Sequence, residues 1–446
     1  MHLQTLTLSA FLYTLSSACF SANWNVSPAD NIIKLDFGVA VEEIYLLDAF
    51  DVNDDGYDDF VVSALVDVES QIGVSCCRVP PSLVGQIKKL TPQLLLSDSN
   101  GRYRQIPFPK ESETIRTWTG KFFTLGRESY FFLGRNGEVS DPVDGNSGET
   151  SVLFKFVADA GNQLKLEPIA ETLFPATTAN VQIVPGQIDV YMLENNYLDF
   201  ENDHPWSRSY VYQFNGKNLQ IAPFAPTGFD MNKANNHLQV ADLDGDGKYD
   251  ILVAAEVMFD FNTNKPQSEM NGSYVIFDAL GDTSSALLPQ ASFGASHAGS
   301  HISVVSLNSS QYVIEIGVRL ENRNQFREPA LSVYEFTPPR SFDRLDIKHD
   351  QEFDVEKFQM SDTQLIDIDA DGDPEVFFQN YSSKPLYLDF DPSPVLKALP
   401  SNQVIKPLSG KGRAIALKTP TCVKLASIED WKKSRYPLLK ISANCL

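Results

Sequence analysis

Asp242-Leu-Asp-Gly-Asp-Gly-Lys-Tyr-Asp250 is a nine-residue acidic stretch that leads directly into the apolar segment Ile251–Ala255. Its four carboxylates stand at positions 1, 3, 5 and 9. Carboxylates this close together repel one another unless a cation lies among them. Oxygen donors at alternate positions, with Gly247 at the bend, are what Ca²⁺ requires. The stretch therefore predicts a calcium loop that enters a β-strand.

The pattern occurs twice more. Asp51-Val-Asn-Asp-Asp-Gly-Tyr-Asp-Asp59 runs into Phe60-Val-Val62, and Asp367-Ile-Asp-Ala-Asp-Gly-Asp-Pro-Glu375 runs into Val376-Phe-Phe378. A polar surface turn could explain one copy, but three copies in the same register before a strand favour calcium. The first loop has Asn53 at position 3 and so one carboxylate fewer, which predicts the weakest of three sites.

An EF-hand loop begins with the same residues but ends with a bidentate Glu at position 12, inside a helix. Here position 12 is Val62, Val253 or Phe378, each within a β-rich apolar run. The acid at position 9 is the last ligand instead, and this excludes an EF-hand.

Short apolar strands recur along the chain about every 60 residues, and helical periodicity is nearly absent. One series follows the acidic loops or similar turns and begins at Phe60, Phe131, Val190, Ile251, Tyr312, Val376 and Leu438. A second series alternates with it and begins at Ile32, Leu94, Val152, Tyr210, Tyr274, Val333 and Leu386. Seven such units predict an all-β fold, a seven-bladed β-propeller of four-stranded antiparallel blades.

The three loops and their strands resemble FG-GAP/VCBS repeats, the units of integrin α-subunit-type β-propellers. The resemblance implies three Ca²⁺ ions, each bound by the acids and by the main-chain carbonyl at position 7. It also implies that the strand at Ile32 joins the last blade and closes the ring. The implied metal ligands are Asp51, Asn53, Asp55, Tyr57 and Asp59; Asp242, Asp244, Asp246, Lys248 and Asp250; and Asp367, Asp369, Asp371, Asp373 and Glu375.

The N-terminus carries an apolar stretch, residues 3–15, followed by Ser16-Ser-Ala-Cys-Phe-Ser-Ala22. This is typical of a secretory signal, although no Lys or Arg precedes it. We expect a signal peptide at 1–22, a single propeller domain at 23–446, and an exported protein that is secreted, periplasmic or at the cell surface. Lipid anchoring through Cys19 is the alternative. No other stretch reaches the ~18 apolar residues of a spanning helix.

Four cysteines remain once the signal is removed: Cys76, Cys77, Cys422 and Cys445. The polar turn Glu429–Tyr436 lies midway between the last two. A hairpin at this turn would place Cys422 and Cys445 opposite each other, so we predict that they form a disulfide. The pairing of Cys76 and Cys77 stays open.

The formal net charge of −22 argues against a nucleic-acid partner. No G-x-S-x-G, P-loop, H-E-x-x-H or G-x-G-x-x-G motif occurs. The sequence favours a non-catalytic binding or adhesion module for a protein or glycan. A carbohydrate-active enzyme (a polysaccharide lyase or hydrolase) and a structural subunit of a surface assembly are the alternatives, because fold alone does not decide function.

Each calcium loop enters a strand at its start, so the segment that leaves the strand should lie on the opposite face of the ring. These segments are long and rich in aromatic and Arg side chains, which are typical of binding surfaces. The candidate binding residues are Tyr197, Trp206, Phe259, Arg323 and Phe326.

Overall fold

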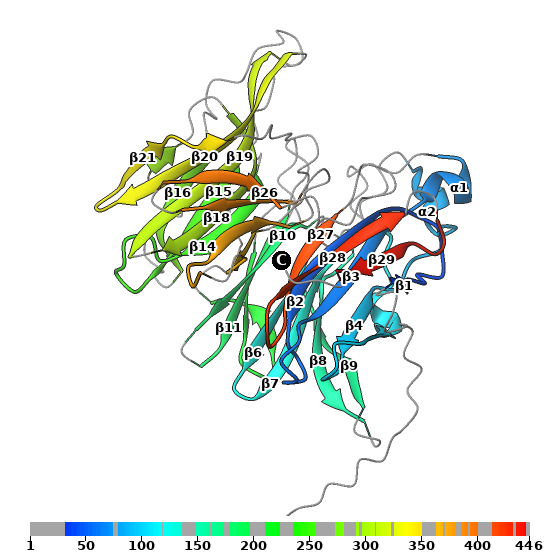
Figure 1. The fold of residues 1–446 in the computed structure, drawn as a ribbon. Helices are drawn as coiled ribbons and strands as arrows, with labels where there is room; N and C mark the ends of the chain where they lie inside the picture. The colour runs from blue at the N-terminus through cyan, green and yellow to red at the C-terminus, as the bar shows by residue number, and fades with distance from the viewer. Residues whose placement is uncertain are drawn as a thin grey trace, which may run out of the picture.

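Seven small, mainly antiparallel sheets follow one another along the chain and form the predicted seven-bladed β-propeller (Figure 1). The structure is a computed structural model that describes residues 32–74, 79–117, 119–135, 149–159, 163–173, 178–186, 188–196, 210–223, 235–255, 273–280, 291–293, 297–307, 309–322, 325–349, 363–368, 371–379, 385–390, 393–399, 413–430 and 434–442.

Blades 1 to 3 each contain four strands in chain order. They are β2 (Val41–Phe50), β3 (Asp59–Val66), β4 (Gln93–Ser97) and β5 (Tyr103–Pro107); β6 (Thr119–Leu125), β7 (Glu128–Gly134), β8 (Val152–Ala158) and β9 (Leu164–Glu171); and β10 (Thr178–Pro185), β11 (Val190–Asn196), β12 (Tyr210–Phe214) and β13 (Leu219–Ile221). Two short helices, α1 (Val68–Ile72) and α2 (Pro81–Val84), lie between β3 and β4 of blade 1. The 3-10 helix η1 (Lys110–Ser112) lies between blades 1 and 2.

Blades 4 and 5 repeat this order. They contain β14 (Asn235–Ala241), β15 (Tyr249–Ala255), β16 (Ser273–Leu280) and β17 (Ala291–Phe293); and β18 (His297–Leu307), β19 (Ser310–Asn322), β20 (Gln325–Thr337) and β21 (Ser341–Leu345). The strands β19 and β20 are the longest in these two blades, and they extend beyond their neighbours at the top of Figure 1.

Blade 6 adds a short fifth strand to the four-stranded plan. Its strands are β23 (Thr363–Ile366), β24 (Glu375–Phe378), β25 (Leu386–Asp389) and β26 (Val395–Ala398), with the two-residue β22 (Lys348–His349) parallel to β26.

Blade 7 joins the first described strand to the last three, as predicted. It contains β27 (Ala414–Lys418), β28 (Val423–Asp430) and β29 (Leu438–Ile441), with β1 (Ile32–Lys34) as the outer strand. Ile32 pairs with Lys440, and Lys34 with Leu438. The prediction for Leu438 is wrong. The sequence pattern places it at the start of the strand that follows the loop, which is the second strand of a blade, but it begins the third strand. The second strand, β28, follows a tight turn that lacks acids.

The core lies between the blades. Successive side chains of a strand point to opposite faces, so each central strand can pack against both neighbouring blades. In β3, Phe60 and Val62 pack with Ile415 of blade 7, whereas Val61 packs with Phe131 of blade 2. Seven clusters of buried apolar residues result, one between each pair of adjacent blades. This two-sided burial explains why the strands are apolar without clear alternation.

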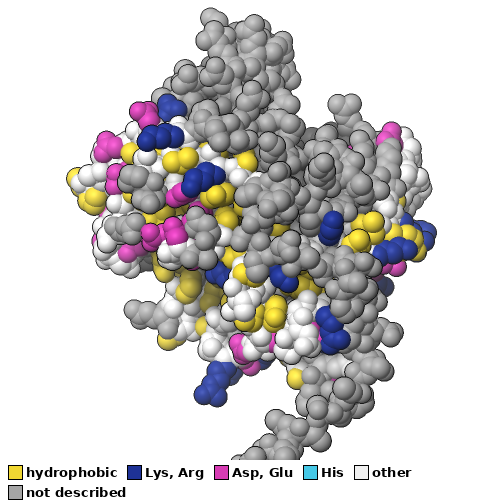
Figure 2. All heavy atoms as spheres, viewed as in Figure 1, with side chains coloured by type: hydrophobic (Ala, Val, Ile, Leu, Met, Phe, Trp, Pro, Cys, Tyr) yellow, Lys and Arg dark blue, Asp and Glu magenta, His cyan; other side chains and the backbone are white. Residues whose placement is uncertain are grey.

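On the described part of the face seen in Figure 2, acidic, basic and apolar side chains lie interspersed. Among the described residues, no helix has the length and apolar character needed to cross a membrane.

Candidate calcium loops

The three acidic loops occupy the same place in three different blades. Each connects the first strand of its blade to the second: residues 51–58 between β2 and β3 in blade 1, 242–248 between β14 and β15 in blade 4, and 367–374 between β23 and β24 in blade 6. We call them loops 1, 2 and 3.

Two hydrogen bonds recur in all three loops. The N–H of the glycine at position 6 donates to the position 1 carboxylate: Gly56 to Asp51 Oδ2 (2.7 Å), Gly247 to Asp242 Oδ2 (2.9 Å) and Gly372 to Asp367 Oδ2 (3.2 Å). These glycines have φ values of 88°, 87° and 99°, which other residues rarely adopt.

The acid at position 9 closes each loop. It accepts a hydrogen bond from the N–H of position 2: Val52 to Asp59 Oδ2 (2.9 Å), Leu243 to Asp250 Oδ2 (2.8 Å) and Ile368 to Glu375 Oε2 (2.6 Å). The position 2 side chains are buried and anchor the loop on the blade. The position 9 acids are buried as well, and burial raises the pKa of Asp59 to about 7 and of Asp250 to about 6.

Loops 2 and 3 gather carboxylate oxygens closely enough to hold a cation. Asp242, Asp244 and Asp250 each offer one oxygen within 4.8 Å of the others, and so do Asp367, Asp371 and Glu375. Within the described part of the chain, these two loops are where such groups of His, Cys, Asp or Glu occur. Asp369, the predicted position 3 ligand of loop 3, lies outside the described residues.

The position 1 carboxylates of these two loops are only half satisfied. Asp242 Oδ1 and Asp367 Oδ1 are buried and have no hydrogen-bond partner, whereas the Oδ2 atoms accept from glycine. A buried carboxylate oxygen without a donor is costly. An oxygen-ligated cation such as Ca²⁺ would compensate this charge, so the residues present in loops 2 and 3 fit the ion.

The side chains at positions 5 and 7 of loop 2 lie apart from this group. Lys248 Nζ lies 3.3 Å from Asp246 Oδ2 and 3.1 Å from Asp278 Oδ1, and these groups are partly exposed. Lys248 therefore offsets the surplus negative charge outside the gathered oxygens.

Loop 1 differs although it makes the same two hydrogen bonds. Asp51 Oδ1 accepts from the N–H of Asp55 (3.1 Å) and Oδ2 from that of Gly56, so both oxygens have donors within the protein. Its acids, all described, do not form a group with oxygens as close as those in loops 2 and 3. The sequence indicates only that Asn53 leaves loop 1 with one carboxylate fewer, and so with weaker calcium binding.

Most of the other predicted functional residues lie outside the described part of the chain. These are the signal peptide, residues 1–22, the cysteines Cys19, Cys76, Cys77 and Cys445, and the candidate binding residues Tyr197, Trp206, Phe259 and Arg323. Phe326 lies in β20, where its backbone pairs with Leu320 of β19. The disulfide between Cys422 and Cys445 stays a prediction.

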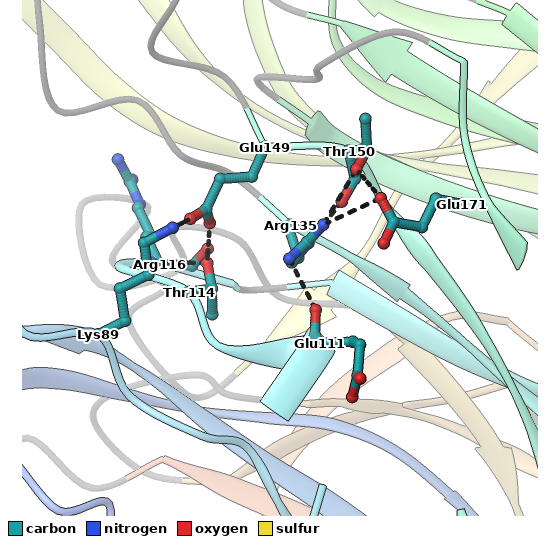
Figure 3. A network of polar contacts seen from close by, with 8 residues as sticks. All are labelled: Lys89, Glu111, Thr114, Arg116, Arg135, Glu149, Thr150 and Glu171. Atoms are coloured by element: carbon teal, nitrogen blue, oxygen red, sulfur yellow. Dashed lines mark hydrogen bonds and ion pairs between the residues drawn. The ribbon is translucent and has the colours of Figure 1, made fainter. Parts of the chain in front are cut away.

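The opposite end of blades 1 and 2 carries a polar network of Lys89, Glu111, Thr114, Arg116, Arg135, Glu149, Thr150 and Glu171 (Figure 3). Lys89 forms an ion pair with Glu149, which also accepts from Thr114 Oγ1 (2.5 Å). Arg135 is largely buried and donates from Nη1 to Glu111 O (2.8 Å) and from Nη2 to Thr150 Oγ1 (3.0 Å). The charged side chains of this network pair with opposite charges or with oxygen acceptors. The network therefore links the interstrand connections of blades 1 and 2 and has a structural role.

No known protein family matches the sequence, and no curated protein does. The chain is similar in structure to the exo-β-1,3-galactanase 1,3Gal43A from Clostridium thermocellum, with 9% identity, a TM-score of 0.34, and coverage of 93% of this chain and 97% of that one. It is also similar to BBS1N in complex with ARL6DN (10% identity, TM-score 0.38, 92% and 96% coverage). A third is the GH43_1 enzyme from Xanthomonas citri complexed with xylotriose (6% identity, TM-score 0.33, 92% and 89% coverage). Similarity this low supports no assignment of activity or ligand.

Proposed function

We propose that this protein is an exported, calcium-stabilised β-propeller that acts as a non-catalytic binding module for a protein or glycan. The observation that carries the calcium part is the pair of buried, unpartnered oxygens, Asp242 Oδ1 and Asp367 Oδ1, each among gathered carboxylates. The shared hydrogen bonds of the three loops support the resemblance to FG-GAP/VCBS repeats.

Calcium would have a structural role here. In blades 4 and 6 the carboxylate at position 1 directly follows the first strand, and the acid at position 9 lies in the second strand. An ion bound by both would hold the two strands together at one end of the blade. It would also offset part of the net charge of −22.

The binding part of the proposal rests on the connections at the other end of the ring. Because the strands of each blade are antiparallel, the connections that leave the second strands lie opposite the calcium loops. In blades 1 to 4 these connections are long and comprise residues 67–92, 135–151, 197–209 and 256–272, whereas in blades 5 to 7 they comprise 323–324, 379–385 and 431–437. The connections from third to fourth strand, at the calcium end, range in length from residues 338–340 to residues 281–290. Long segments on a rigid scaffold are typical of binding sites.

The test is a panel of glycans, polysaccharides and candidate protein ligands, applied to the protein in calcium and assayed for both retention and product formation. We expect retention on a ligand without cleavage or elimination products. Ala substitutions at the five candidate residues Tyr197, Trp206, Phe259, Arg323 and Phe326 should lower retention. Phe50→Ala is the matched control, because Phe50 is an exposed aromatic at the calcium end of β2.

Release of oligosaccharides from a polysaccharide would contradict the non-catalytic part of the proposal and favour the carbohydrate-active alternative. Retention that survives all five substitutions would place the ligand elsewhere.

A further inference from the structure

In loop 1 a serine from another strand lies among the predicted calcium ligands. Ser97, the last residue of β4, is buried. Its hydroxyl donates to Asp59 Oδ1 at 2.7 Å and lies 3.2 Å from the carbonyl oxygen of Tyr57. It also lies 3.3 and 3.4 Å from the two oxygens of Asp55. The hydroxyl thus contacts the predicted ligands at positions 5, 7 and 9 together.

Donors from the protein occupy every carboxylate oxygen of the predicted ligands in this loop. Asp51 accepts from two backbone N–H groups. Asp55 accepts from the N–H of Tyr57 (2.9 Å) and from Asn53 Nδ2 (3.2 Å). Asp59 accepts from the N–H of Val52 on one oxygen and from the N–H and hydroxyl of Ser97 on the other. These donors satisfy the carboxylate oxygens that a cation would otherwise bind.

The equivalent positions of the other two loops lack this hydroxyl. The pairs Phe60–Leu95, Ile251–Ile276 and Val376–Leu388 align the three blades. Two residues beyond the third-strand partner stand Ser97, Asp278 and Phe390. The N–H of Asp278 donates to Asp250 Oδ1 (2.9 Å), as that of Ser97 does to Asp59 Oδ1 (2.6 Å), but the Asp278 side chain accepts from Lys248. Phe390 has no hydroxyl, and its ring packs against that of Tyr312.

Blade 7 also holds loop 1 from outside. The N–H of Asp58 donates to Lys418 O (3.0 Å), and the N–H of Lys418 donates back to Asp58 Oδ2 (2.7 Å). A Cβ on Gly56 would lie 2.9 Å from Pro420 Cγ, so the loop packs closely on the turn after β27. These contacts hold loop 1 against blade 7.

We propose that loop 1 is a metal-free version of the site, closed by the Ser97 hydroxyl, and that the protein binds two calcium ions, at loops 2 and 3. This inference rests on the proposed calcium binding and changes its stoichiometry from the three ions that the sequence predicts. Ser97 is the residue that sets the difference, because its hydroxyl lies against the oxygens that an ion in loop 1 would need.

The test is the number of calcium ions bound per protein molecule, measured by equilibrium dialysis after chelation and return of calcium. We compare the wild type with Asp51→Asn and Asp242→Asn, which change the same position in loops 1 and 2. The expected counts are two for the wild type, two for Asp51→Asn and one for Asp242→Asn. Three ions in the wild type and two in Asp51→Asn would overturn the inference.

Zero ions in the wild type would instead refute the proposed calcium binding, so the two failures are distinguishable. Ser97→Ala gives a second readout that does not depend on counting. If Ser97 replaces the ion, the melting temperature of Ser97→Ala should fall by the same amount in calcium and in chelator. A fall seen only in calcium would show that Ser97 is a ligand and would overturn the inference.

Discussion

The position 1 carboxylates of loops 2 and 3 should make opposite contributions to stability with and without a cation. Without one, Asp367 is a half-buried carboxylate whose buried Oδ1 lacks a donor, close to Asp371 and Glu375. With one, the same charge would attract the ion. We therefore expect this single side chain to connect the proposed calcium binding to the stability of blade 6.

The effect of Asp367→Asn on the free energy of unfolding should have opposite signs in calcium and in chelator. In calcium we expect the variant to be less stable than the wild type by about 1–3 kcal/mol, since a charged ligand is lost. In chelator it should be as stable or more stable, because the amide is uncharged and repels neither neighbour. Unfolding by urea in both buffers measures this. Asp343→Asn, at an exposed position on β21, is the control and should respond equally in both buffers; an equal response of Asp367→Asn would contradict the expectation.

Glu315 is a buried acid away from the loops. It lies in β19 and accepts a hydrogen bond from Ser273 Oγ (2.5 Å) across the boundary between blades 4 and 5. Burial raises its pKa from 4.5 to about 7. The folded state therefore holds this proton more tightly than the unfolded state, and stability from this group declines as the pH rises from about 4.5 to 7.

Glu315→Gln should remove that decline. Relative to the wild type, the variant should gain stability as the pH rises, by at most about 3 kcal/mol at pH 8, and gain little at pH 4.5. Chemical unfolding between these pH values is the measurement, with exposed Glu167→Gln as the control. A difference between Glu315→Gln and wild type that stays constant with pH would show that Glu315 does not titrate in this way.

At the level of loops and strands, the sequence predicts what is local. The donors and acceptors that give loops 1 to 3 their shape lie within nine residues of one another, so spacing alone reveals them. It misses the contribution of Ser97, which lies 38 residues from Asp59 and meets it only when β4 pairs with β3. It also misplaces Leu438, because the turn before β28 carries no acid to mark the second strand.

The register of β28 and β29 sharpens the disulfide prediction. Ala426 pairs with Ile441, and Ser427 with Lys440. If this register continued to residue 445, Cys422 would stand opposite Cys445. We expect peptide mapping without reductant to yield a Cys422–Cys445 linked pair, and Cys445→Ser to lower the melting temperature only under oxidising conditions. Linkage of Cys422 to Cys76 or Cys77 would contradict the pairing.

At the level of the whole molecule, the repeat predicts the ring because every blade must bury both faces, and the resemblance to FG-GAP/VCBS repeats implies its closure by the strand at Ile32. The seven apolar clusters between blades meet that need, and β1 completes the last blade beside β29. The choice of ligand is not encoded in this repeat, because the connections opposite the calcium loops differ from blade to blade in length and composition.

Calcium binding to the folded ring should stabilise the whole molecule by mass action, by about 2.7 kcal/mol for each site at a free concentration of 100 times the dissociation constant. The measurement is thermal unfolding of the wild type in calcium, after chelation, and after calcium is restored, with magnesium as the matched control. We predict a lower melting temperature in chelator that returns with calcium and returns less with magnesium. A melting temperature that is the same in all four conditions would contradict calcium stabilisation of this propeller.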